Sequence, residues 1–381
     1  MADINIISPK WAENVQDASN GVLPSGDDSS IDTFLVSWNN FKSLLNKSVT
    51  AGSIFSNPIV STYSLVYTTS NAYRGGVLTP NGDIHFIPYN ARVGQKISSI
   101  SIVSTYSLVY TSTAGALYSG GVLAPNGDTH FAPSKADRGQ KISSSGVVST
   151  YSLVYTTSEA YEGGVLATNG EVHFIPRNAA VGQKINSSGV VSTYSLVYTA
   201  TSGTYFGGVL ASNGDIHFIP TYANRGQKIS SSGVVSTYSL VYTNSSAAHV
   251  GGVLSSSGDI HFVPFAANRG QKIDINGTVS TYSLIYTVSS GTYHGGVLAP
   301  NGDIHFIPLV ANRGQKISSS GIVSTYSIIY TVLNAYVSGV LNQAGEIHFV
   351  PFAANRGQKI STTACLPFDI GTCCSSFLNK F

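Results

Sequence analysis

The sequence predicts an all-β protein, a seven-bladed β-propeller with four strands in each blade. One unit of 43–45 residues repeats seven times between about residues 60 and 360. Each unit contains four short segments of strand-forming residues, and no hydrophobic pattern with the helical period of 3.6 residues runs through the repeats. A His-Phe pair marks the period in every copy, and its histidines are His85, His130, His173, His217, His261, His305 and His348.

The first copy shows the four expected strands in order. Residues 63–67 alternate in hydrophobicity and are rich in β-forming residues, which predicts the outer strand. Residues 75–78 and 84–87 flank Asn81-Gly82, which predicts a hairpin with a type I′ turn. Residues 95–97 form the last short strand.

The Gly-Gly-Val-Leu segment of each copy is expected to be the strand nearest the propeller axis, because glycine allows backbones to approach closely. The first outer strand, residues 60–68, has no partner before it, and the last copy, residues 339–361, has no outer strand after it. The two pieces are therefore expected to complete one blade, so that the N-terminal strand closes the ring.

The propeller, residues 59–361, is flanked by shorter segments. Residues 1–28 are expected to form an extended arm, and apolar residues at helical spacing predict a short amphipathic helix over residues 29–48. Residues 362–381 form an apolar tail that contains Cys365, Cys373 and Cys374, in which we do not expect a metal site. We expect the arm and helix to dock into an assembly through Trp11, Phe34, Trp38 and Phe41.

An acidic residue precedes each repeated histidine by two positions, so both side chains share one face of a strand. The pairs could form seven metal or acid–base sites, or they could form a buried polar network that fixes each blade. We favour the structural role, because seven identical catalytic sites are implausible, and we expect no metal or cofactor. The pairs are Asp83/His85, Asp128/His130, Glu171/His173, Asp215/His217, Asp259/His261, Asp303/His305 and Glu346/His348.

Variation between copies collects in two loops that propeller connectivity places on one face. Loops on a rigid scaffold commonly bind partners, although drift after duplication would also produce such variation. The aromatic residues before the Gly-Gly pairs could pack between blades or form an exposed collar around the channel. The candidate binding residues are Tyr73, Arg74, Tyr118, Tyr161, Glu162, Arg177, Tyr205, Phe206, Tyr222, His249, Tyr293, His294 and Tyr336.

Composition and motifs narrow the function. Charged residues make up 10% of the chain and the net charge is +2, so we expect no nucleic-acid partner. No signal peptide and no apolar stretch long enough for a membrane span are seen. The motifs of serine hydrolases, zinc proteases and P-loop enzymes are missing as well, which favours a protein that is not an enzyme.

The repeat unit, as in residues 295–308, resembles a repeat of structural or uncharacterised proteins from bacteriophages and large DNA viruses. The resemblance covers about 300 residues and implies a non-enzymatic virion component, such as a capsid decoration, spike or tail-associated protein. It also implies a place on the virion surface. The arm and tail would contact other virion proteins, and the variable face would contact a protein, a host glycan or a receptor. The alternative is a free soluble lectin or protein-interaction propeller.

Overall fold

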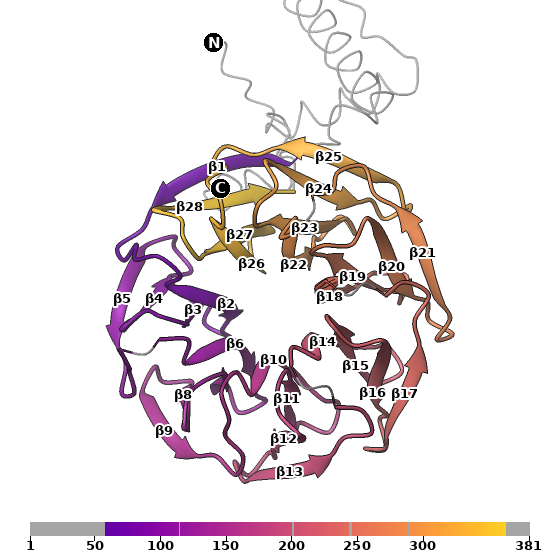
Figure 1. Cartoon of the computed structure of the whole chain (residues 1–381). Helices are drawn as coiled ribbons and strands as arrows, with labels where there is room; N and C mark the ends of the chain where they lie inside the picture. The colour runs from indigo at the N-terminus through magenta and orange to yellow at the C-terminus, as the bar shows by residue number, and fades with distance from the viewer. Residues whose placement is uncertain (1–57, 114, 200–201, 244–245, 289, 363–381) are drawn as a thin grey trace, which may run out of the picture. The chain divides into compact units, whose positions relative to one another are not determined.

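The structure is a computed structural model that describes residues 58–113, 115–199, 202–243, 246–288 and 290–362. Within these residues, 28 strands form seven antiparallel sheets of four strands, which stand like blades around one axis (Figure 1). The predicted seven-bladed propeller with four-stranded blades is confirmed. The expected arm, the expected helix and nearly all of the tail lie outside the described residues. None of the described segments forms a helix with the length and hydrophobicity that a bilayer crossing needs.

The Gly-Gly strands lie nearest the axis, as predicted (Figure 1). Gly75 has a positive φ of 89°, and the pairing of its strand shifts register there. A Cβ atom on Gly75 would come within 2.6 Å of the Gly120 Cα atom in the next blade, so no larger residue fits. The inner strands are β2 (Tyr73–Leu78), β6 (Tyr118–Leu123), β10 (Tyr161–Leu166), β14 (Tyr205–Leu210), β18 (His249–Leu254), β22 (Tyr293–Leu298) and β26 (Tyr336–Leu341).

The second strand of each blade is the most completely buried. These strands are buried along almost their whole length, because each lies between two strands of its own sheet and packs against a neighbouring sheet. They are β3 (Ile84–Pro88), β7 (Thr129–Pro133), β11 (Val172–Pro176), β15 (Ile216–Pro220), β19 (Ile260–Pro264), β23 (Ile304–Pro308) and β27 (Glu346–Pro351).

The turn between the first two strands differs from the expected type I′. Gly82 N donates to Thr79 O at 2.9 Å, and Gly82 has a positive φ of 85°, whereas Asn81 does not have a positive φ. This is a type I turn followed by a left-handed glycine. The same turn forms in the third, fourth and fifth sheets, which have Thr168, Ser212 and Ser256 in place of Pro80, so proline suits the turn but does not cause it. Leu78 pairs with Ile84, and a connection of this length is commonly built on a type I turn with a left-handed residue after it.

Third strands join each blade to its neighbour. Gln95 Oε1 accepts hydrogen bonds from Val66 N at 3.0 Å and Tyr67 N at 2.8 Å, which follow the outer strand of the adjacent blade. The glutamine of each other copy makes the same pair of bonds. The third strands are β4 (Val93–Ile97), β8 (Arg138–Ile142), β12 (Val181–Ile185), β16 (Arg225–Ile229), β20 (Arg269–Ile273), β24 (Arg313–Ile317) and β28 (Arg356–Ser361).

The outer strands form the circumference of the propeller in Figure 1. In the seventh sheet this place is taken by β1, which pairs with β28 from Ile59↔Ser361 to Ser64↔Arg356. The expected strand over residues 60–68 is thus shorter and ends at Ser64. The outer strands are β1 (Ile59–Ser64), β5 (Val103–Ser107), β9 (Val148–Ser152), β13 (Val191–Ser195), β17 (Val235–Ser239), β21 (Val279–Ser283) and β25 (Val323–Ser327).

Candidate functional site

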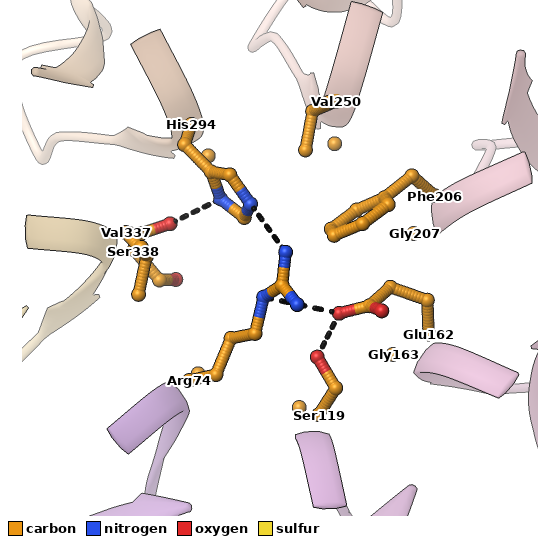
Figure 2. Close-up of a pocket in the computed structure, with 14 residues that line it drawn as sticks. Arg74, Ser119, Glu162, Gly163, Phe206, Gly207, Val250, His294, Val337 and Ser338 are labelled. Atoms are coloured by element: carbon orange, nitrogen blue, oxygen red, sulfur yellow. Dashed lines mark hydrogen bonds and ion pairs between the residues drawn. The ribbon is translucent and has the colours of Figure 1, made fainter. Parts of the chain in front are cut away.

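One residue from each blade reaches the mouth of the central channel on the variable face. It follows the first aromatic residue of each inner strand, and with the neighbouring glycines it lines a cavity of about 120 Å³ (Figure 2). We call these residues the axial ring: Arg74, Ser119, Glu162, Phe206, Val250, His294 and Val337.

The six tyrosines that begin the inner strands are fully buried, so they form no exposed collar. Tyr73 packs against Phe86 at a centroid distance of 5.8 Å, and its hydroxyl donates to Val93 O at 3.1 Å. The Tyr67 ring, which follows the outer strand of the adjacent blade, lies 6.2 Å from that of Tyr73, and Val340 and Val350 of that blade belong to the same core cluster. The rings therefore pack where neighbouring blades meet. His249 takes the same buried place in the fifth sheet, where burial lowers its pKa to about 3 and keeps it neutral.

A second set of residues surrounds the axial ring. Each follows the proline at the end of a second strand, and its carbonyl generally accepts a backbone N–H from the next blade, as in Leu117 N to Tyr89 O at 3.0 Å. Tyr222 lies one position further along and is 51% exposed, away from the residues that line the cavity. We call this set the loop ring: Tyr89, Ser134, Arg177, Thr221, Phe265, Leu309 and Phe352.

Arg74 extends across the mouth and contacts side chains from distant blades (Figure 2). Its Nε lies 3.3 Å from Glu162 Oε1, an ion pair without the alignment of a hydrogen bond. Its Nη2 lies 3.3 Å from His294 Nε2, which belongs to a residue 220 positions away in the sequence. Its guanidinium lies 4.7 Å from the centre of the Phe206 ring and 5.0 Å from that of Tyr89.

Glu162 is a buried carboxylate between two guanidinium groups. It is 2% exposed, and its Oε2 lies 3.3 Å from Arg177 Nη1 while Ser119 Oγ donates to Oε1. Burial raises the pKa of Glu162, and the positive charges of Arg74 and Arg177 oppose that rise. Arg177 Nη2 also lies 3.1 Å from Glu159 Oε2, and Glu159 Oε1 lies 3.7 Å from Lys135 Nζ. Arg74, Arg177 and Lys135 thus share two carboxylates, which leaves one surplus positive charge.

His294 is held as one neutral tautomer. Its Nδ1 lies 2.6 Å from Val337 O, a carbonyl that only accepts, so Nδ1 carries the proton. Nε2 then has a lone pair directed at Arg74, an arrangement assigned from these hydrogen bonds. Burial, followed by the charge of Arg74, lowers the pKa of His294 to about 3, so the ring stays uncharged near neutral pH.

The acid and histidine pairs lie toward the opposite end of each blade and make separate contacts. Lys96 Nζ lies 2.6 Å from Asp83 Oδ2, and the equivalent ion pair recurs in each other blade. His217 Nδ1 lies 3.4 Å from the Tyr238 hydroxyl of the outer strand. In the part of the chain that the structure describes, no three His, Cys, Asp or Glu side chains gather as metal ligands would.

Arg74, Glu162, Phe206 and His294 were candidate binding residues from the sequence, but the sequence could not show that they meet. Ser119, Val250 and Val337 lie at the same variable position and were not chosen as candidates, and of the loop ring only Arg177 was chosen. The sequence signal that could have identified them is that they occupy equivalent positions in the seven repeat copies. The assembly candidates Trp11, Phe34, Trp38 and Phe41 lie outside the described residues.

No protein-family model matches the chain, and no curated protein matches it. Solved propeller structures do match. A streptogramin B lyase aligns with a TM-score of 0.70 and 20% identity, over 81% of this chain and 99% of that one. A catalytically inactive virginiamycin B lyase from Staphylococcus aureus with quinupristin gives 0.69 and 18%, over 80% and 99%. The WD40 propeller domain of Doa1 gives 0.61 and 13%, over 80% and 98%.

These similarities show the fold, and they correct one expectation. We expected a protein that is not an enzyme, because the sequence contains no known catalytic motif. The lyases have the same architecture over nearly their whole length, so the propeller fold does not exclude catalysis. Other similar structures are an extracellular domain of a hybrid two component system and an auxiliary nutrient binding protein, so the fold serves several functions.

Proposed function

We propose that this protein is a ligand-binding propeller whose axial cavity takes the acidic end of a partner molecule, in the first place the C-terminal carboxylate of a peptide. The observation that carries the proposal is the ion-pair cluster around Glu162, in which Arg74, Arg177 and Lys135 share the two carboxylates of Glu159 and Glu162. Arginine recognises carboxylates through paired N–H groups, and Arg74 remains 15% exposed at the mouth.

The size and surroundings of the cavity support insertion of a chain end. A volume of about 120 Å³ is smaller than the several hundred Å³ of typical sites that enclose a whole small molecule. The rest of the bound peptide would then lie on the loop ring, where Tyr89, Phe265 and Phe352 are partly exposed. Aromatic side chains of this kind often anchor protein partners.

The experiment compares a mixture of acetylated tripeptides that have free carboxyl ends with the same mixture in amidated form. Native mass spectrometry should detect complexes with the free acids alone. Arg74→Gln should abolish them, whereas Arg92→Gln should not, because Arg92 is an exposed residue of the β3–β4 loop outside the cavity. Equal binding of both mixtures would contradict the proposal even if Arg74→Gln lowered the melting temperature.

A second candidate is small-molecule turnover in the same cavity. It is favoured by the neutral His294 and the buried Glu162, which are groups able to exchange a proton, and by the similarity to lyases. Incubation with quinupristin followed by mass spectrometry tests it. A product that forms with the wild-type protein and not with His294→Gln would support it.

We also propose that the protein is a virion surface component, with residues 1–48 and the C-terminal tail contacting other virion proteins. The resemblance of the repeat unit to viral structural repeats supports this location. Mass spectrometry of purified particles would test it, and the protein's absence from them would contradict it. Particles made with a chain that lacks residues 1–50 would show whether incorporation depends on that segment.

A further inference from the structure

A second cavity lies on the face opposite the axial ring, at the junction of the fifth and sixth sheets. Its volume is about 280 Å³, more than twice that of the axial cavity. The β18–β19 turn of the fifth sheet forms one wall, and the β24–β25 linker of the sixth sheet forms another. We call it the junction cavity.

The repeats explain why the cavity opens at this junction. The β6–β7 turn contains Pro125, and a Cβ atom on Gly170 of the next blade would lie 3.5 Å from the Pro125 ring. A proline in this turn therefore reaches the neighbouring blade. Ser256 takes that place in the fifth sheet. Its Oγ would also lie 3.5 Å from a Cβ atom on Gly302, but a serine side chain has fewer atoms than a proline ring and fills less of the space. Thr168 and Ser212 occupy it in the third and fourth sheets, where smaller cavities of about 70 and 110 Å³ lie.

Hydroxyl groups dominate the walls of the junction cavity. Ser255 and Ser257 of the turn have their Oγ atoms 2.8 Å apart, and the Oγ atoms of Ser318 and Ser320 in the linker are also 2.8 Å apart. Each hydroxyl can donate one hydrogen bond and accept others. Tyr282, Ile304 and Ile317 complete the lining with less polar surface.

Within the described part of the chain, the Oδ1 atom of Asp259 lacks the backbone hydrogen bond that the equivalent aspartates of other blades accept. Asp215 Oδ1 accepts from Ser231 N at 3.1 Å, and Asp303 Oδ1 accepts from Ser319 N at 3.3 Å. Asp259 has no such bond to a described residue, and Ile275 stands where those serines are. Its side chain is 16% exposed, against 9% for Asp215 and Asp303. One carboxylate oxygen therefore remains available in the cavity.

The charges in the cavity cancel. Lys272 Nζ lies 2.7 Å from Asp259 Oδ2, so the cation and the anion neutralise each other. Burial lowers the pKa of His261 to about 4, so its ring carries no charge near neutral pH. A phosphate or sulfate would find no surplus positive charge, and a metal ion would find no second carboxylate. A neutral ligand with several hydroxyl groups fits this lining best.

We propose that the junction cavity binds a neutral monosaccharide unit. Asp259 Oδ1 accepts from one sugar hydroxyl, Lys272 donates to a neighbouring one, and the serine hydroxyls bind the others. The sugar carbons face Ile304 and Ile317. The site is separate from the axial cavity and does not depend on the function proposed for it.

The test uses saturation-transfer NMR with glucose, galactose, mannose and N-acetylglucosamine as separate probes, and inorganic phosphate as a competitor. The double variant Ser256→Pro, Ser257→Asn gives the fifth turn the Pro-Asn-Gly sequence of the sixth. It should fold, because Gly258 N donates to Ser255 O at 3.1 Å as Gly302 N donates to Ala299 O at 2.9 Å. Thr168→Pro is the matched control, since it makes the same kind of change at another junction.

We expect at least one sugar to receive saturation from the wild-type protein and from Thr168→Pro, and none to receive it from the double variant. Phosphate should not compete. The proposal is overturned if no sugar receives saturation, if the double variant behaves like the wild type, or if phosphate displaces the sugar. A melting temperature of the double variant close to that of the wild type would show that the variant is folded.

Discussion

One position in each blade changes while its neighbours stay nearly constant, and it is the position that faces the axis. The preceding residue is a tyrosine in six blades because its buried ring packs in the core, as Tyr205 does with no exposed surface, and His249 replaces it in the fifth. The following residue is a glycine in six blades because the next blade lies close to it, and Ser338 replaces it in the seventh. The residue at this position can therefore differ between blades without disturbing the fold, as Arg74, Glu162 and His294 do. These side chains determine the chemistry of the channel mouth.

Substitution of Gly120 tests the contact between inner strands. Gly120 and Gly146 have the same φ of 83°, but a Cβ atom would meet Gly163 Cα at 2.8 Å from Gly120 and nothing within 4 Å from Gly146. We expect Gly146→Ala to cost about 1–2 kcal/mol of unfolding free energy for the left-handed backbone. Gly120→Ala should cost a further ~1–3 kcal/mol for crowding. Equal costs in urea denaturation would contradict the close packing.

The sequence revealed which residues vary but not which of them meet. The contact between Arg74 and His294 joins residues 220 positions apart. It depends on the diameter of the channel and on the rotamers of long side chains, which a repeat pattern does not encode. The burial of the tyrosines was one of two stated alternatives, and the local pattern could not decide between them because both place the ring beside the axis.

At the scale of elements, the seventh sheet combines strands from opposite ends of the propeller. Deletion of residues 58–64 would remove β1 and leave β28 as an open edge. We expect a loss of stability larger than that of one strand and association through the exposed edge. Light scattering after size-exclusion chromatography would detect oligomers, and calorimetry would measure the stability.

An added synthetic peptide with the sequence of residues 58–64 is the control, because it should restore the monomer by pairing with β28. A deleted chain that remains monomeric with an unchanged melting temperature would contradict the role of β1.

Element types were predictable because alternation, glycine pairs and prolines recur seven times, so each assignment was supported repeatedly. The β2–β3 turn was not predicted correctly. Asn81-Gly82 favours a type I′ turn when two residues connect the strands, but here Leu78 pairs with Ile84 and the connection is longer. The dipeptide alone does not reveal where the strands end, so the turn type could not be predicted from it.

For the whole molecule, the histidines predict sensitivity to acid. The chain has nine histidines, and burial is the first cause that lowers the pKa of each, to about 4 or about 3. Unfolded histidines take up protons near pH 6.5, well before the folded ones. The contribution of the neutral histidines to the free energy of unfolding is therefore fully present above about pH 6.5 and is lost as the pH drops toward 4. Each histidine contributes a loss of up to ~1.4 kcal/mol per pH unit.

We expect the melting temperature to fall steeply between pH 6.5 and pH 5 when it is followed by circular dichroism. His249→Tyr restores the residue of the other six blades and removes one titrating group, so it should stabilise the protein more at pH 5 than at pH 7. A melting temperature that is constant over this range would show that the histidines are not buried as described.

The pairing of β1 with β28 has a mechanical meaning. Ile59 and Ser361 lie opposite each other at the same end of the ladder. A force that pulls the two ends of the propeller apart therefore loads a single pair of residues first and then moves to the next pair. The hydrogen bonds of this ladder would break one after another, so the ring should open under lower tension than a ladder loaded along its whole length.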